Sequence, residues 1–431
     1  MRRVLIISPH FPPVNAPDMQ RVRLALPWLG PLGWDPVVVA VAPDRVEGAS
    51  LDPVLEQTYP ADIRVMRTGG LRASVTRWAG LGSLWLRCGQ PLVHAAEQLL
   101  AGGGIDLVFI STTQFGAFPL GPRWRARFGV PYVLDFQDPW VNDYYARTGT
   151  PPPGGKLKYA LSQWHARRHE PAALRSASGI VSVSDEYGPM LARRYPWFDA
   201  TRVTVIPFGA STLDFDVARQ HRPDRPLVPF GDGNIHFVYA GRVVDGMRHA
   251  LTLLFGALRL LRENDPALAA RVRLHFIGTN YAPPPRDRPM VLPIAREAGV
   301  EELVREYTSR VAYFDALHYL VKADGLLAIG SDDAGYSASK IFPCLLAGRP
   351  LLALFHRDSP VQGLVQGQTG VVSVPFDPTV DSAAGANAIW RRWFAPWGTL
   401  PAVHLSPETQ EMITAESMTR RLAGFFDQAV S

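Results

Sequence analysis

The 431-residue chain lacks the short motifs of several large enzyme classes. No G-x-G-x-x-G follows its first apolar run, and neither G-x-x-x-x-G-K-[ST] nor a nucleophile elbow occurs. These absences argue against a standard dinucleotide dehydrogenase, a P-loop enzyme and an α/β hydrolase.

Cysteine is equally scarce, since Cys88 and Cys344 are the only two. Two distant cysteines cannot form a disulfide framework, and no His, Cys or carboxylate cluster has the spacing of metal ligands. We therefore expect a reducing, cytoplasmic location and neither a metal nor a cofactor.

Long apolar runs are also missing. The start, MRRVLIISPHFPP, has only a short apolar run before Ser8 and His10, too short for a signal-peptide core. No run approaches the ~18 apolar residues that suggest a membrane span.

Charge is modest and uneven. Residues 1–215 contain 22 Lys and Arg against 17 Asp and Glu, whereas residues 216–431 contain 22 of each. The net charge of +5 therefore belongs to the first half, but the dense basic clusters of a nucleic-acid-binding protein are absent, and we expect no nucleic-acid partner. The composition, 47% hydrophobic and 19% charged, is that of a soluble globular protein.

The first half alternates short apolar runs with helical stretches, which predicts a parallel sheet covered on both faces. Ligands collect beyond the carboxyl ends of such strands, here at Ser8–Pro13, Ser111–Gln114 and Asp135–Trp140. A helix is expected over Pro17–Leu29, and strands over Val4–Ile7, Pro36–Val41, Ile63–Met66, Asp106–Ile110, Tyr132–Phe136, Ile180–Val183 and Val203–Ile206.

A polar stretch rich in proline and glycine, Phe208–Asn234, has the composition of a linker before a second alternating series. The series predicts strands over Ile235–Tyr239, Val272–Ile277, Val311–Phe314, Gly325–Ile329, Leu351–Phe355 and Val371–Val374. Helices are expected over Leu251–Arg262, Pro293–Tyr307, Ala338–Ala347 and Pro407–Ala429.

The second series contains its clearest βαβ unit between Ala323 and His356. Its polar loop offers Ser337 or Ser339 as a helix cap and places Lys340 in the first helical turn. Free amides and the helix dipole there favour an anion, although an ordinary loop with a solvated lysine explains the same residues.

Other cations and glycines follow predicted strands of this half. Gly241 and Arg242 come directly after a strand, Arg248 lies six residues later, and Gly278 ends the next strand. With Lys340, two such arginines can neutralise a diphosphate, and the glycines allow a ligand to approach the backbone.

In the first half, Asp135, Gln137 and Asp138 end a strand, where paired carboxylates can act as base and orienting group. Asp138 precedes a proline and is equally suited to capping a helix. His10 also ends a strand and can act as a base of near-neutral pKa, although a lone histidine in a proline-rich loop is usually structural.

Residues Leu71–Gly89 are basic, aromatic and free of acids. A helix in which Arg72, Arg77 and Arg87 alternate with Trp78 and Trp85 can lie on an anionic membrane surface. The alternative is a helix that faces the core and exposes its arginines, and two glycines weaken a continuous amphipathic helix.

Seven segments, in this order, resemble GT-B-fold glycosyltransferases of the retaining family 4 type, in particular bacterial members that build polysaccharides and glycoconjugates. The resemblance covers nearly the whole chain. The segments are LIISPHFPP with Arg21 and Arg23, VLDFQDPW, SGIVSVSDEYGPML, RVTVIPFGAS, VYAGRVV, ADGLLAIG and SASKIFPCLLAGRPLLAL.

The resemblance implies an α/β protein of GT-B fold with two Rossmann-like domains that face each other across a cleft. We expect an acceptor-binding domain over 1–215, a nucleotide-sugar-binding domain over 216–395, and a helical segment over 396–431 that crosses back to the first. The activity would be transfer of a sugar from a UDP- or GDP-linked donor, with retention and without metal. The acceptor would be a glycan, a lipid-linked molecule or a small molecule, with peripheral association at the inner membrane surface.

The resemblance also implies which residues bind the donor, which bind the acceptor and which act in catalysis. Arg242, Arg248, Lys340, Gly241, Gly278, Ser337, Ser339 and Asp333 would bind the donor. Arg21, Arg23 and Gln114 would bind the acceptor, and Asp138, Asp135, Gln137 and His10 would act in catalysis.

The chain departs from the family pattern at its acidic pair, because the E-x7-E positions carry Gly335 and Pro343. The loss motivates a second hypothesis, a catalytically degenerate GT-B protein that binds nucleotide or glycan as a partner or scaffold. A GT-B-fold sugar-nucleotide epimerase is a third.

Overall fold

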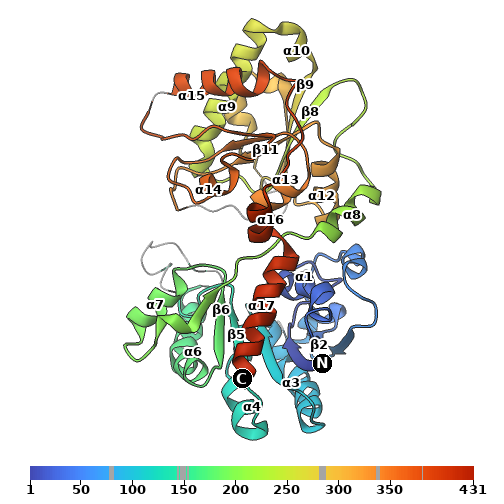
Figure 1. The fold of residues 1–431 in the computed structure, drawn as a ribbon, viewed down its shortest axis with the longest axis vertical. Helices are drawn as coiled ribbons and strands as arrows, with labels where there is room; N and C mark the ends of the chain where they lie inside the picture. Colours follow the sequence, from blue (N-terminus) through green and yellow to red (C-terminus); the bar gives the residue numbers. More distant parts are fainter. Residues whose placement is uncertain are drawn as a thin grey trace. The chain divides into compact units, whose positions relative to one another are not determined.

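The computed structural model describes residues 1–76, 82–142, 145, 152, 155–280, 288–335, 340–380 and 382–431. The chain forms two units, which are considered separately (Figure 1). Unit 1 is Met1–Gly209 with Thr414–Ser431, and unit 2 is Ala210–Ile413.

Unit 1 is built on a seven-stranded, wholly parallel sheet in the order β3-β2-β1-β4-β5-β6-β7. Its strands are close to the runs predicted from hydrophobicity. They are β1 (Arg2–Ile7), β2 (Trp34–Val41), β3 (Arg64–Thr68), β4 (Leu107–Ser111), β5 (Tyr132–Phe136), β6 (Gly179–Ser182) and β7 (Val203–Val205).

Side chains alternate across this sheet and build two cores, because successive residues of a strand point to opposite faces. Leu5 and Ile7 of β1 pack with one helical layer, whereas Val4 and Ile6 pack with the other. The unit 1 helices are α1 (Gln20–Leu29), α2 (Ala73–Thr76), α3 (Leu84–Ala101), α4 (Leu120–Phe128), α6 (Lys156–Arg175), α7 (Tyr187–Arg194) and α17 (Ala415–Val430).

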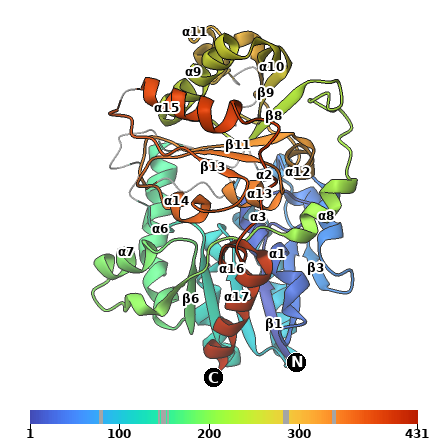
Figure 2. The same cartoon turned by 45° about the horizontal axis from the view of Figure 1, so that its top comes forward.

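The C-terminal helix α17 belongs to unit 1 and lies beside α1 (Figure 1 and Figure 2). Phe426 is fully buried, with its ring 5.4 Å from that of Trp34 and 5.0 Å from that of Phe109. The return to unit 1 begins at Thr414, whose side chain caps α17 through the Ser417 amide. The sequence places this return near residue 396, and the predicted helix over Pro407–Ala429 is interrupted at Thr414.

Unit 2 contains a six-stranded parallel sheet in the order β10-β9-β8-β11-β12-β13. In both views α9 and α15 lie together over one of its faces (Figure 2). The strands are β8 (Ile235–Ala240), β9 (Val272–Ile277), β10 (Val304–Tyr307), β11 (Gly325–Ile329), β12 (Leu351–Leu354) and β13 (Val371–Ser373). The helices are α8 (Thr212–Gln220), α9 (Arg248–Asn264), α10 (Pro266–Arg271), α11 (Leu292–Glu297), α12 (Tyr313–Lys322), α13 (Ile341–Leu346), α14 (Val361–Val365), α15 (Ser382–Ile389) and α16 (Pro407–Ile413).

Two predictions in the middle of unit 2 are wrong. The expected helix over Pro293–Tyr307 ends early, because Gly299 takes a φ of 68° and stops α11, and Val304–Tyr307 then joins the sheet as β10. The expected strand over Val311–Phe314 instead leads into α12.

The predicted linker over Phe208–Asn234 is also partly helical. The Ser211 hydroxyl accepts a hydrogen bond from the Asp214 amide and caps α8, which packs against α12. Unit 2 therefore begins at Ala210 rather than at 216.

Both sheets reverse their direction of winding at one point. In unit 1 the reversal lies between the neighbouring strands β1 and β4, and in unit 2 between β8 and β11. Loops beyond the carboxyl ends of such strands diverge and leave a crevice, so these two edges are the expected places for ligands.

No helix of the described residues is long and apolar enough to cross a membrane.

The place of α17 in the unit 1 core can be tested by Phe426→Ala. Removing a fully buried aromatic ring should lower the unfolding free energy by about 3–5 kcal/mol, as measured by urea denaturation. The control is Asp427→Ala, which removes an exposed ion pair with Arg2 and should cost no more than about 1 kcal/mol. Similar small losses in both variants would contradict the packing of this helix.

Candidate functional site

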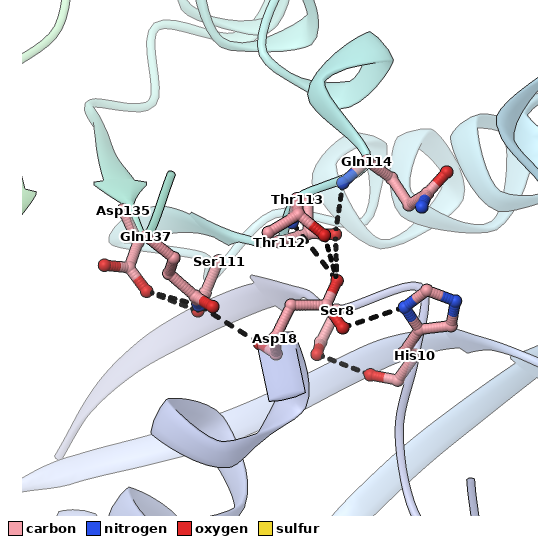
Figure 3. A network of polar contacts seen from close by, with 9 residues as sticks. All are labelled: Ser8, His10, Asp18, Ser111, Thr112, Thr113, Gln114, Asp135 and Gln137. Carbon is pink, nitrogen blue, oxygen red and sulfur yellow. Dashed lines mark hydrogen bonds and ion pairs between the residues drawn. The ribbon is translucent and has the colours of Figure 1, made fainter. Parts of the chain in front are cut away.

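The reversal point of unit 1 carries a compact polar network (Figure 3). Ser8 and His10 follow β1, Ser111 to Gln114 end and follow β4, and Asp18 comes from the 3-10 turn Pro17–Met19 that begins the α1 segment. Asp18 lies between the two groups, with His10 on one side and Thr112 and Thr113 on the other.

Asp18 uses both carboxylate oxygens. Oδ1 lies 2.8 Å from Nδ1 of His10, and Oδ2 accepts hydrogen bonds from Thr112 Oγ1 at 3.0 Å and from Thr113 N and Oγ1, both at 3.1 Å. Burial acts to raise the pKa of Asp18, but the bond and charge of His10 and the threonine donors outweigh it and hold the pKa below its usual value. Asp18 is therefore a fixed anion at neutral pH.

His10 is oriented by this anion. Its backbone carbonyl accepts a hydrogen bond from the Ser8 hydroxyl at 2.8 Å, and its side chain keeps 17% of its surface exposed. A carboxylate beside Nδ1 favours the proton on that nitrogen, which leaves Nε2 to accept another. In Figure 3 the second ring nitrogen points away from Asp18, as a proton acceptor requires.

A second cluster lies beside the first and is wholly buried. Asp135 Oδ2 accepts from Ser111 Oγ at 2.7 Å, Gln137 Nε2 at 2.8 Å and Arg21 Nε at 2.9 Å. Gln137 Nε2 also lies 3.1 Å from the Asp18 carbonyl oxygen and so joins the two clusters.

This burial changes the interpretation of four predicted site residues. Arg21, Arg23 and Asp135 are 0% exposed and Gln137 is 8% exposed. Arg21 also donates to the Ile206 carbonyl, and Arg23 to Thr58 and Gln20. Side chains buried to this extent have almost no accessible surface with which to contact an acceptor or a sugar. Their hydrogen bonds instead attach α1 to β5 and to neighbouring loops.

Two other predicted residues of unit 1 remain at the surface. Gln114 is partly exposed, and its side chain points away from the network (Figure 3). Asp138 is exposed, yet nearby protein atoms and the charge of Asp18 raise its pKa.

The reversal point of unit 2 carries a cation. Lys340 immediately precedes α13, and its Nζ donates to the Tyr239 hydroxyl and lies 3.3 Å from the Arg242 carbonyl oxygen and 4.4 Å from the centre of the Tyr239 ring. Within the described residues all these partners are neutral. Burial therefore lowers the pKa of Lys340 to about 8.

Glycines end two neighbouring strands of this sheet, and the first of them lies beside the cation. Gly241 follows β8 with a φ of 143°, and a Cβ there would lie 3.2 Å from Lys340 Cδ. Gly278 follows β9 with a φ of 72°, which side chains rarely adopt. The strand ends of unit 2 thus expose backbone beside a partly buried ammonium group.

The remaining predicted donor residues differ in position. Arg242 is exposed and contributes its carbonyl oxygen to the Lys340 cluster. Arg248 is also exposed, but its guanidinium forms an ion pair with Glu297 of α11 instead of joining Lys340. Asp333 is exposed and accepts from the Gly335 amide within its own turn. Ser337 and Ser339 lie outside the described residues.

Sequence reasoning missed Asp18, Thr112, Thr113 and Tyr239. The sequence gives no sign that Asp18 belongs to the site. It lies at the start of a helix, eight residues after His10, and its threonine partners come from a loop nearly a hundred residues further along the chain. The sequence places Tyr239 at the end of a predicted strand without a role in the site, whereas in the structure its hydroxyl accepts a hydrogen bond from Lys340. Among the described residues no group of three or more His, Cys, Asp or Glu side chains is placed to hold a metal ion.

Comparison with known proteins finds a family match within unit 1. Residues 20–209 match the family model described as Glycosyl transferase 4-like domain. Among curated proteins none matches the chain.

Solved structures with the same fold cover the whole chain. A glycosyltransferase from Rickettsia africae ESF-5 has 12% identity and a TM-score of 0.56, covering 100% of this chain and 99% of that one. HepE of Anabaena, solved with UDP and glucose, has 18% identity and a TM-score of 0.51, covering 98% and 95%. Sucrose-phosphate synthase from Thermosynechococcus elongatus has 16% identity and a TM-score of 0.54, covering 99% of each chain. At these identities the likeness shows the fold, and it confirms the predicted GT-B architecture of two Rossmann-like domains.

The buried ammonium predicts a pH effect on stability. Lys340 loses its proton near pH 8 in the folded state but near 10.5 when unfolded, so the unfolded state binds more protons between these values. The unfolding free energy of the wild type, relative to Lys340→Met, should therefore rise by about 2–4 kcal/mol from pH 8 to 10.5. Denaturant titrations of both proteins at several pH values measure this difference. Parallel pH profiles would show that Lys340 is not desolvated.

Proposed function

We propose, from the match of residues 20–209 to the family model described as Glycosyl transferase 4-like domain, that the protein transfers a sugar from a nucleoside diphosphate sugar to a hydroxyl group of an acceptor. Unit 2 binds the donor and unit 1 presents the acceptor. UDP is the favoured nucleotide, because the fold relative HepE is solved with UDP.

The observation that carries the proposal is the environment of Lys340. A partly buried ammonium group whose described partners are neutral oxygens is costly for the free protein, as its lowered pKa indicates. A diphosphate beside Gly241 supplies the missing negative charge. The same cation then stabilises the charge that develops on the leaving UDP.

The His10–Asp18 pair supplies the proton acceptor in this proposal. The acceptor oxygen bonds to the anomeric carbon on the same face from which the diphosphate departs, which retains the configuration. The bond from that carbon to the diphosphate breaks, and UDP departs with the electron pair. The hydroxyl proton passes to Nε2 of His10, and Asp18 stabilises the imidazolium that forms. Asp138, with a raised pKa, is a second candidate to exchange protons at this edge.

The finer features of the reaction come from the resemblance to retaining family 4 enzymes. We propose retention at the anomeric carbon, with leaving-group charge balanced by Lys340 and Arg242 and no cofactor. The acceptor is a glycan or a lipid-linked molecule, which the protein binds in the cytoplasm or at the inner membrane surface.

A second candidate function is favoured by one observation. Gly335 and Pro343 occupy the positions of the family's acidic pair, and Pro343 lies inside α13, so neither offers a carboxylate to a ribose or sugar hydroxyl. A degenerate GT-B protein that binds nucleotide without turnover would have this pattern. Product formation from a UDP-sugar, followed across a panel of acceptors, separates the two.

The donor site can be tested by calorimetric titration with UDP. Lys340→Met should weaken UDP binding by about 10- to 100-fold, since a charge-assisted hydrogen bond contributes about 1.5–3 kcal/mol. Arg248→Met is the matched control, because that arginine is engaged with Glu297 and should leave affinity within about twofold. Equal effects of both substitutions, or none, would remove Lys340 from the donor site.

The proton acceptor can be tested by steady-state kinetics. His10→Ala should lower kcat by about 10²- to 10⁴-fold with UDP affinity unchanged. Asp18→Asn should also lower kcat, because the imidazolium that forms during the reaction loses its counter-charge. A variant His10→Ala with normal kcat would assign the pair a purely structural role.

A further inference from the structure

The first half of α6 presents an apolar surface to solvent. Leu157, Leu161 and Trp164 are 77%, 60% and 67% exposed, and their spacing of four and three residues places them on one helix face. We name this set of three residues the α6 stripe. Three large apolar side chains aligned in this way are unusual on a surface that meets only water.

The stripe is turned away from the body of unit 1. Three of the four buried residues of α6, namely Ala166, Glu170 and Ala173, each follow a stripe residue by nine positions, which is roughly two and a half helical turns. The two sets therefore lie on opposite sides of the helix. Glu170 anchors the buried side by accepting bonds from Arg194 and Tyr195.

The charge around the stripe has one sign. Residues 156–169 contain four cations, Lys156, Lys158, Arg167 and Arg168, and no carboxylate. An amphipathic helix with tryptophan and leucine on one face and lysine and arginine beside them fits the headgroup region of an anionic bilayer.

A neighbouring segment adds to the same surface. Leu86 of α3 is 63% exposed and lines a groove with His165 and His169 of α6 and with Gly116. The carboxylate among the described groove residues, Glu97, is already paired with Arg123 and Arg127. Through Gly116 the groove also borders the segment that follows β4.

We propose that the α6 stripe, with Leu86 beside it, binds the surface of an anionic lipid membrane. The apolar side chains enter the boundary between headgroups and acyl chains, and the flanking cations meet lipid phosphates. Only Leu86 of this surface comes from the stretch Leu71–Gly89, for which the sequence left membrane contact and core packing open. Within that stretch Arg87 is buried and bonded to the carbonyl oxygens of Arg45 and Leu71.

The test is co-sedimentation of the full chain with vesicles. Phosphatidylglycerol-containing vesicles should bind the wild type, and neutral phosphatidylcholine vesicles should bind it at least tenfold more weakly, with binding reduced by salt. Leu161→Glu should lower binding to the anionic vesicles at least tenfold. Val380→Glu, at an apolar residue of unit 2 with 54% exposure, is the matched control and should bind as the wild type does.

Trp164 provides a direct report of insertion. Brominated acyl chains should quench its fluorescence, and Trp164→Phe should remove the quenched component. Equal binding to both vesicle types, no binding, or unchanged binding of Leu161→Glu would overturn the proposal. So would a wild-type dimer that Leu161→Glu dissociates without any vesicle binding, since the stripe would then join two copies. Because vesicle binding requires no donor, UDP titration of the same variants tests the transferase proposal independently.

Discussion

All strands of each sheet run in the same direction, and this constraint organises the candidate chemistry. Parallel strands place all their carboxyl ends at one edge, and helices must cover both faces, so polar loops collect at that edge. The winding reverses between β1 and β4 and between β8 and β11. His10 and Thr112 meet at the first reversal, and Gly241 and Lys340 at the second, although each pair is about a hundred residues apart in the chain.

The buried charged residues of unit 1 hold in place the loops at the carboxyl ends of its strands. Asp135 joins Arg21, Ser111 and Gln137 in a buried cluster, and Gln137 also donates a hydrogen bond to the Asp18 carbonyl oxygen. Removing one partner of such an ion pair leaves a buried charge, which is strongly destabilising. The cluster therefore holds in place the segment that carries Asp18, while the less buried His10 keeps a ring nitrogen for a substrate. Unit 2 differs in this respect, because the described partners of its cation, Lys340, are neutral groups.

The alternation of strand and helix was predictable because hydrophobic periodicity is local, and β9, β11 and β5 occur as expected. The error at Pro293–Tyr307 arose where a helix and a strand follow each other closely, separated by Gly299 and the short 3-10 turn Glu301–Leu303. Arg248 was grouped with Lys340 because both follow strand ends, but sequence spacing does not show which acidic residue a long side chain will meet, and Glu297 lies on another helix. Asp18 was overlooked for the same reason, since its threonine partners come from a distant loop.

By itself, the sequence determined the two α/β units, the strands whose ends carry functional groups, and the resemblance to glycosyltransferases that the match over residues 20–209 confirms. These features depend on local periodicity and on short motifs. Tertiary structure alone decided that Arg21 and Asp135 form part of the interior, that Asp18 orients His10, and that the α6 stripe faces solvent. Burial and pairing are properties of side chains brought together from distant segments, and so no window along the chain contains them.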